Sequence, residues 1–207
     1  MTEITPTKLK SLISFIISES DHDLGAIELA KIVYLIDVEN FKFAGQTITG
    51  EHYTRQEKGP LALNFTDAIN EMDGYEVVVS VGKSRGTSQI PKRNHTKGER
   101  HRFSPILTST EFAIARKILE RVENLTPFEI QNLAYGTEPM IAIIEKEKVK
   151  NSGLLLGEKI DFSKVKQNVL INKWRVNMKA EEEPDKEFND FLAKEREEID
   201  ELLSSLK

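Results

Sequence analysis

The apolar positions in the first quarter of the chain recur with helical spacing. Between residues 9 and 17 they fall three and four apart, which predicts an amphipathic helix that begins after Thr5-Pro6-Thr7. From Ala26 to Ala44 they cover most of the circumference of a helix, so we expect a central helix that is buried on most sides. Gly45 follows at the position where a left-handed helix cap is expected.

The middle of the chain shows helical and extended patterns in turn. A helix is predicted from Leu61 to Met72, because Gly59-Pro60 supplies a break and then a proline suited to a first helical turn. The β-branched run from Tyr75 to Val81 is bounded by glycines and predicts a strand. We expect a return strand near Arg100 to Ile106, and His52 to Gln56 is a candidate third strand.

Helix-capping signals organise the next part of the chain. Thr108 or Ser109 opens one helix, with Glu111 placed for a capping box, and Thr126 opens a second. A third start at 137–139 leads to about residue 150. We therefore expect the α+β class: a mainly helical single domain with a small antiparallel sheet of two or three strands and a C-terminal amphipathic helix.

The C-terminal part of the chain has a different pattern. A glycine-containing connector from about 151 to 161 leads towards a strongly charged helix with an apolar stripe, comprising Phe188, Phe191, Leu192, Ile199 and Leu202. We place the boundary between a main domain, 1–150, and a C-terminal extension, 151–207, at this connector. Such a stripe packs on its own core, pairs with a second copy of the chain or binds another partner.

Composition narrows the classes of function. The 207-residue chain has no cysteine, which excludes disulfides, iron–sulfur clusters and thiol catalysis. No apolar run approaches the ~18 residues of a membrane span, and the net charge of −5 does not fit a globally basic nucleic-acid binder. We expect a cytoplasmic protein. The four histidines lack the spacing of metal ligands, so neither a metal nor a cofactor is predicted.

The basic segment, residues 83–102, is the first candidate binding surface. It carries seven basic residues against the single acid Glu99, and Lys92, Arg93 and Lys97 are among them. A strip of this kind binds nucleic-acid phosphates with salt-dependent affinity, and it can equally contact an acidic protein. It lacks interleaved aromatic residues on which bases could stack, which favours the protein partner.

Asp37 is the residue for which chemistry is hardest to assign. Helical spacing places it on an apolar face, where an unpaired carboxylate costs several kcal/mol. A structural role predicts hydrogen bonds from the backbone amides of the 45–50 loop, or from Tyr53 or Arg55. The alternative is a general base, but no second acid, histidine or nucleophile is visibly placed to work with it.

The order of the residues around Asp37 resembles a known family. The series consists of Lys31, Tyr34, Asp37, Gly45, Thr49, Gly50, Tyr53, Gly59 and Pro60. It is similar to the Panacea domain of SocA-like antitoxins, and the helix starts at 126–130 and 136–139 agree with later helices of that family. Leu61 and Met140 depart from the pattern, which commonly has valine and tryptophan at these places.

The resemblance implies a protein without catalysis of its own that binds and neutralises a toxin encoded beside it, in a phage, prophage or other mobile element of a bacterium. A second implied role is delivery of the toxin to a cytoplasmic protease. The resemblance leaves open whether the chain forms a homodimer. The alternative function is a nucleic-acid-binding regulator that uses residues 83–102.

The partner surface is expected along the polar segment after the central helix, on the basic segment and on the C-terminal stripe. The candidate contact residues are Glu51, Arg55, Lys58, Lys92, Arg93 and Lys97, together with the five stripe residues.

Overall fold

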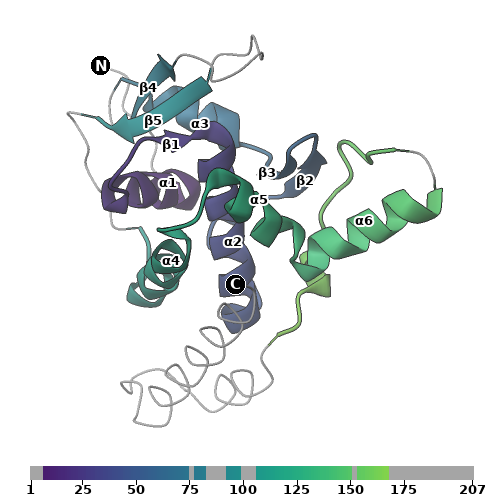
Figure 1. Cartoon of the computed structure of the whole chain (residues 1–207). Helices are drawn as coiled ribbons and strands as arrows, with labels where there is room; N and C mark the ends of the chain where they lie inside the picture. The colour runs from purple at the N-terminus through teal and green to yellow at the C-terminus, as the bar shows by residue number, and fades with distance from the viewer. Residues whose placement is uncertain (1–6, 75–76, 83–91, 99–105, 151–152, 168–207) are drawn as a thin grey trace, which may run out of the picture. The chain divides into compact units, whose positions relative to one another are not determined.

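The computed structural model describes residues 7–74, 77–82, 92–98, 106–150 and 153–167 of the chain. These residues form six α-helices and two small antiparallel sheets, which confirms the mainly helical α+β class (Figure 1). The chain divides into two compact units, 1–168 and 169–207, and the described residues all belong to the first. The predicted C-terminal helix lies outside the described residues.

Helix α2 (Ala26–Ala44) is the centre of the described unit, and three helices pack against it: α1 (Lys8–Glu19), α4 (Ser109–Val122) and α5 (Pro127–Tyr135) (Figure 1). Leu29, Val33 and Ile36 of α2 have no exposed surface, as expected for a helix with apolar residues on most of its circumference. Gly45 ends the helix with φ 67°, the left-handed conformation that the sequence predicts.

Capping boxes begin α4 and α5, the first two of the three later helices, where the sequence places them. The later helices are α4 (Ser109–Val122), α5 (Pro127–Tyr135) and α6 (Glu138–Lys150). Thr108 Oγ1 accepts the Glu111 N–H at 3.2 Å, and Glu111 Oε2 accepts the Thr108 N–H at 2.8 Å. The same glutamate forms an ion pair with Lys8 and so joins α4 to α1.

The first sheet has the strand order β1-β5-β4. Its strands are β1 (Leu24–Gly25), β4 (Val77–Gly82) and β5 (Lys92–Lys97). Strand β5 lies within the basic segment, before residue 100, where the sequence predicts no strand. Pairing with the valines of β4 and burial of His95 beside Leu24 O, 3.0 Å away, outweigh the polar composition. The strand predicted near Arg100 to Ile106 lies almost wholly outside the described residues.

The second sheet is a hairpin of β2 (Tyr53–Gln56) and β3 (Gly59–Ala62). The predicted third strand therefore exists, but it pairs with β3 and does not extend the first sheet. The helix predicted from Leu61 begins only at Phe65, as α3 (Phe65–Met72). Residues 59–62 form the β ladder instead, and Pro60 is tolerated because β3 is an edge strand.

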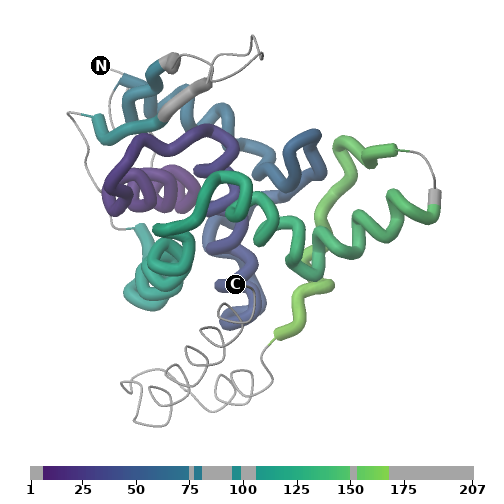
Figure 2. Tube along the Cα trace, viewed as in Figure 1, coloured from purple at the N-terminus to yellow at the C-terminus, as the bar shows by residue number. Residues whose placement is uncertain are grey.

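Residues 153–167, which we call the strap, run from α6 back along the outer side of β2. Figure 2 shows this segment returning from the far end of α6 towards the hairpin. The Arg55 N–H donates to Glu158 O at 2.8 Å and the Ile160 N–H donates to Tyr53 O at 2.9 Å. Ile160 and Val165 are buried, so the strap contributes to the same core as the helices.

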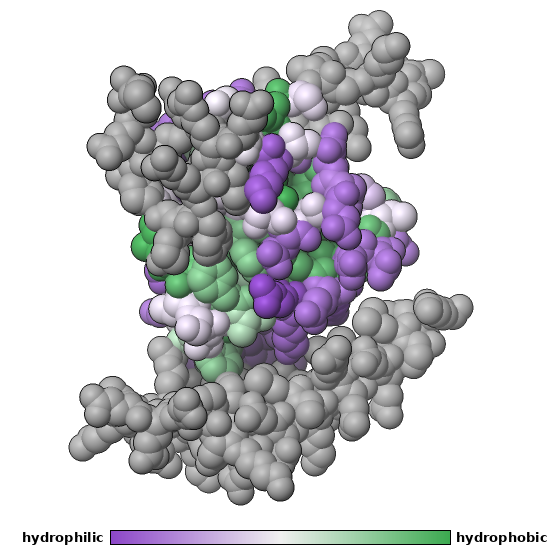
Figure 3. Space-filling model, turned by 90° about the vertical axis from the view of Figure 1, so that its left-hand side faces the viewer, coloured by the Kyte–Doolittle hydropathy of each residue, from purple (hydrophilic) through white to green (hydrophobic). Residues whose placement is uncertain are grey.

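The surface of the described unit is mixed in polarity. Hydrophilic and hydrophobic residues occupy adjacent patches on the face shown in Figure 3, so hydropathy alone does not single out a binding surface there. None of the described helices is long and apolar enough to cross a membrane.

Candidate functional site

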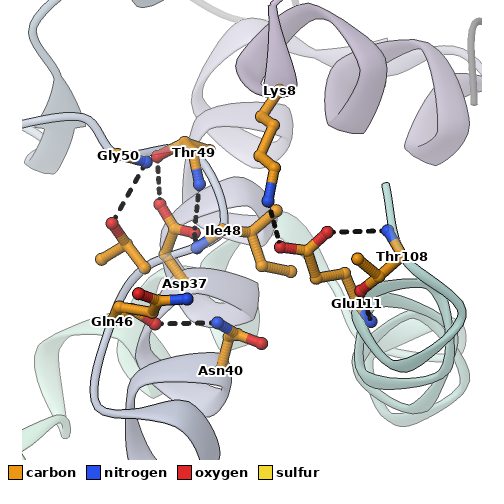
Figure 4. Close-up of polar contacts among 10 residues, drawn as sticks. Lys8, Asp37, Asn40, Gln46, Ile48, Thr49, Gly50, Thr108 and Glu111 are labelled. Carbon is orange, nitrogen blue, oxygen red and sulfur yellow. Dashed lines mark hydrogen bonds and ion pairs between the residues drawn. The ribbon is translucent and has the colours of Figure 1, made fainter. Parts of the chain in front are cut away.

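The Asp37 carboxylate is the hub of a buried cluster that holds the loop after α2. Its Oδ1 accepts the backbone N–H groups of Ile48 at 2.7 Å and Thr49 at 3.1 Å (Figure 4). Its Oδ2 accepts the Thr49 hydroxyl, and also the Tyr53 hydroxyl at 2.7 Å. These donors are the loop amides and the tyrosine that the structural interpretation of Asp37 predicts.

Burial decides the chemistry that Asp37 can perform. The residue is 0% exposed, and burial raises the pKa of its carboxyl to about 6 although all four hydrogen bonds act to lower it. Burial and the neighbouring Asp37 raise the pKa of Tyr53 in turn, so the phenol stays a donor. A general base must reach its substrate, and the enclosed Asp37 carboxylate cannot. The general-base alternative is therefore wrong for Asp37.

A second side chain of α2 fastens the same loop. Asn40 Nδ2 donates to Gln46 O at 2.8 Å, and the Gly50 N–H donates to Thr47 Oγ1 at 3.2 Å (Figure 4). Asn40 stands three residues after Asp37, so both point from one side of the helix to the loop. Sequence reasoning missed Asn40, although this spacing was a signal that could have found it.

Lys31, also on α2, holds the hairpin through β3. Its Nζ donates to Pro60 O at 2.6 Å, and only 3% of the residue is exposed. Burial, with a smaller contribution from the Arg55 cation, lowers the pKa of Lys31 to about 8. Gly59 has φ +104°, and a Cβ there would lie 3.1 Å from Lys31 Cε. The Gly-Pro pair therefore serves close packing of β3 on α2.

Arg55, expected at the partner surface, is buried instead. It is 3% exposed, because it faces inward on β2 as Tyr53 does. Its Nε donates to Glu147 Oε1 at 3.0 Å, and its guanidinium lies over the Tyr135 ring, 5.3 Å from the centroid. Glu147 Oε1 also accepts the Leu155 N–H at 2.9 Å, so the ion pair connects β2, α6 and the strap.

An aromatic group completes the interior beside the Asp37 cluster. The rings of Tyr34 and Tyr53 lie 5.2 Å apart, and Phe162 of the strap lies 5.8 Å and 5.3 Å from them. The Tyr34 and Thr137 hydroxyls form a hydrogen bond of 2.7 Å. Sequence reasoning missed Phe162, because it stands beyond the residues that carry the resemblance.

A surface hollow of about 570 Å³ opens on the outer side of this arrangement. The loop after α2 forms one wall and the strap forms the other, and half-buried Phe41 and Phe162 lie between them. Three charged residues line it: Glu51, Lys159 and Asp161. Glu51 Oε2 accepts a hydrogen bond from Asn64 Nδ2 at 2.9 Å, which fixes its position.

Lys58 and Lys97 do not line the hollow. Lys58 is exposed at the turn between β2 and β3, and Lys97 is exposed in the other sheet. The backbones of Lys92 and Arg93 belong to β5, but their side chains are outside the description. The stripe residues Phe188, Phe191, Leu192, Ile199 and Leu202 lie outside the described residues. Among the predicted contact residues whose side chains the structure describes, only Glu51 lines the hollow.

The chain matches a known protein family. Residues 29–139, more than half of the chain, match the family described as "Antitoxin SocA-like, Panacea domain". The matched range contains Lys31, Asp37 and Tyr53 with their hydrogen-bond partners in the loop and β3, whereas the strap lies beyond its end. No curated protein matches the chain in sequence. Within the described part of the chain, no group of three His, Asp or Glu side chains could hold a metal ion.

Proposed function

The chain belongs to the family of SocA-like antitoxins with a Panacea domain, and from this premise we propose that it neutralises a cognate toxin protein by binding it directly. The family supports a toxin as the partner and a non-catalytic role. The toxin expected for such a protein is encoded beside it, in the genome of a bacterium or of a phage that infects it. Both proteins are expected to act in the bacterial cytoplasm.

The observation that carries the proposal is what the motif residues do. Asp37, Lys31 and Tyr53 are at most 3% exposed, so they cannot contact a partner directly. Their hydrogen bonds instead fix the backbone of the loop after α2 and of the hairpin. A surface that is rigid before binding loses less conformational entropy on binding than a mobile surface does. We assign the outer side of this loop, where it lines the hollow, to the toxin.

The chemistry of the hollow fits a protein partner. Its half-buried aromatic rings, Phe41 and Phe162, offer apolar contact area, and its charged residues surround them. Interfaces commonly combine an apolar centre with a polar rim, and a few central residues carry most of the binding energy. Glu51 and Asp161 favour a toxin segment that presents a basic side chain.

Co-expression tests the proposal in cells. Growth arrest by the adjacent toxin gene should be relieved by the wild-type chain, and Glu51→Lys with Asp161→Lys should reduce that relief. Glu120→Lys reverses one exposed charge on α4, half of the charge change in the pair, and should preserve it. No relief by the wild-type chain would overturn the proposal, and equal relief by all variants would overturn the assignment of the hollow.

The same cells separate neutralisation by binding from delivery to a protease. Binding alone leaves the lifetime of the toxin unchanged or longer. Delivery shortens it, and the shortening disappears when the protease is deleted. We propose direct binding as the primary mode, so the toxin should persist in an inactive complex.

A further inference from the structure

Helix α6 has a face that none of the other described elements covers. Pro139, Met140 and Ile143 are buried on one side of the helix. On the opposite side, Ile141 is 42% exposed and Val149 is 86% exposed. Figure 1 shows α6 extending away from α2, and the elements that it contacts most are α5 and the strap.

Large apolar side chains are concentrated on this helix and the strap that follows it. Four of the exposed large apolar residues belong to these two segments: Ile141, Val149, Leu154 and Leu156. Single exposed apolar residues are ordinary on a protein surface, but a group of them on a projecting element marks an interaction site. We call the exposed face of α6 the α6 face.

The α6 face carries exposed charges of both signs. Lys146 pairs with Glu158 at 3.1 Å and Glu147 pairs with Arg55 at 3.0 Å, so both are engaged within the chain. Glu145 and Lys148 are exposed, and neither forms an ion pair with the described residues. They stand three residues apart and therefore share one side of the helix with Ile141 and Val149.

We propose that the α6 face binds the α6 face of a second copy of the chain, antiparallel about a twofold axis. The register that sets Glu145 opposite the second copy's Lys148 also sets Val149 opposite its Ile144, which is half-buried. The twofold axis repeats both contacts, which makes the interface isologous. A partner of one charge sign would leave either Glu145 or Lys148 facing a like charge, whereas a second copy satisfies both.

The proposed dimer is weak and reversible. One helix pair buries less than the ~1,200 Å² that a stable, specific interface needs. We therefore expect a dissociation constant in the micromolar range or above. This dimer does not depend on the toxin, because the α6 face does not include the hollow.

Sedimentation of the full chain over a concentration series tests the proposal. The wild-type chain should shift from monomer to dimer as concentration rises. Glu145→Lys and Lys148→Glu should each weaken the dimer about five- to tenfold, because each sets like charges opposite one another twice. The double variant should restore it, and so should a mixture of the two single variants. Glu120→Lys is the charge control.

The restored variants guard against a folding artefact, because a misfolded chain would not regain the dimer on mixing. A wild-type chain that stays monomeric up to about 1 mM would overturn the proposal. So would a dimer that neither single reversal weakens. If the wild-type chain and both single reversals are monomeric and the reversals weaken toxin binding, the α6 face binds the toxin and the proposal is wrong.

Discussion

The Tyr53 hydroxyl lies 2.7 Å from Asp37 Oδ2 and donates a hydrogen bond to it inside the core. This bond joins β2 to the central helix, while the other carboxylate oxygen holds the loop between them. One charged group therefore fixes three consecutive segments of the chain. The buried cluster acts in this way on the shape of the surface.

Replacement of Asp37 by asparagine should destabilise the protein by about 2–4 kcal/mol, because the new amide group cannot accept from both hydroxyls at Oδ2. Urea denaturation gives the free energy of unfolding. Asp67→Asn makes the same chemical change at an exposed position of α3 and should cost less than about 1 kcal/mol. Equal effects of the two changes would show that the Asp37 cluster contributes no special stability.

Asp37 should titrate near pH 6 in the folded protein, because burial raises its pKa from 3.8 to about 6. Between these values the native state binds the proton and the unfolded state does not. The contribution of Asp37 to stability is therefore fully present below about pH 4 and falls, by about 3 kcal/mol in total, as pH rises through 6. Carboxyl carbon chemical shifts measured against pH report the pKa directly. A midpoint below 4 would contradict the dominance of burial.

Gly59→Ala should lower the free energy of unfolding by about 2–4 kcal/mol. The alanine would have to adopt φ +104°, and its Cβ would lie 3.1 Å from Lys31 Cε. Gly50→Ala is the matched control: φ is +71° there, but no atom lies within 4 Å of the new Cβ. It should cost about 1 kcal/mol from backbone strain alone. Thermal unfolding of both variants measures the difference. A control as costly as Gly59→Ala would locate the effect in φ and not in contact with Lys31.

Glu147→Gln should loosen the strap, because it leaves the buried Arg55 guanidinium without its carboxylate and weakens the contact to the Leu155 N–H. We expect a loss of about 2–3 kcal/mol and faster hydrogen exchange at the Gly157 and Ile160 amides, which bond to β2. Glu158→Gln removes only the exposed pair with Lys146 and should change stability by less than about 1 kcal/mol. If hydrogen exchange at these amides is unchanged in Glu147→Gln, the ion pair does not hold the strap on β2.

The helices and their caps could be predicted because their causes are local. Helical spacing, a glycine after α2 and threonines placed before glutamates all act within a few residues. The hairpin was partly missed for the opposite reason. Gly59-Pro60 reads locally as a helix start, but the contact of Pro60 O with Lys31, 29 residues earlier, favours a strand.

Long-range partners also explain the errors at the candidate site. A charged Arg55 on a short strand suggests exposure, yet its partners Tyr135 and Glu147 stand 80 and 92 residues later. Phe162 and the strap lie beyond the family motif, so no pattern connected them to the Asp37 cluster. The loop itself was predictable, since a buried aspartate requires donors and the nearest ones follow it in sequence.

Titration calorimetry of the purified full chain with the purified product of the adjacent toxin gene tests the central claim most directly. The account predicts a saturable complex, at least tenfold weaker for Glu51→Lys with Asp161→Lys and unchanged for Glu120→Lys, with all chains folded. Two results together would contradict the account: a folded wild-type chain that does not bind this toxin in the calorimeter, and a toxin that still arrests growth when the chain is co-expressed with it.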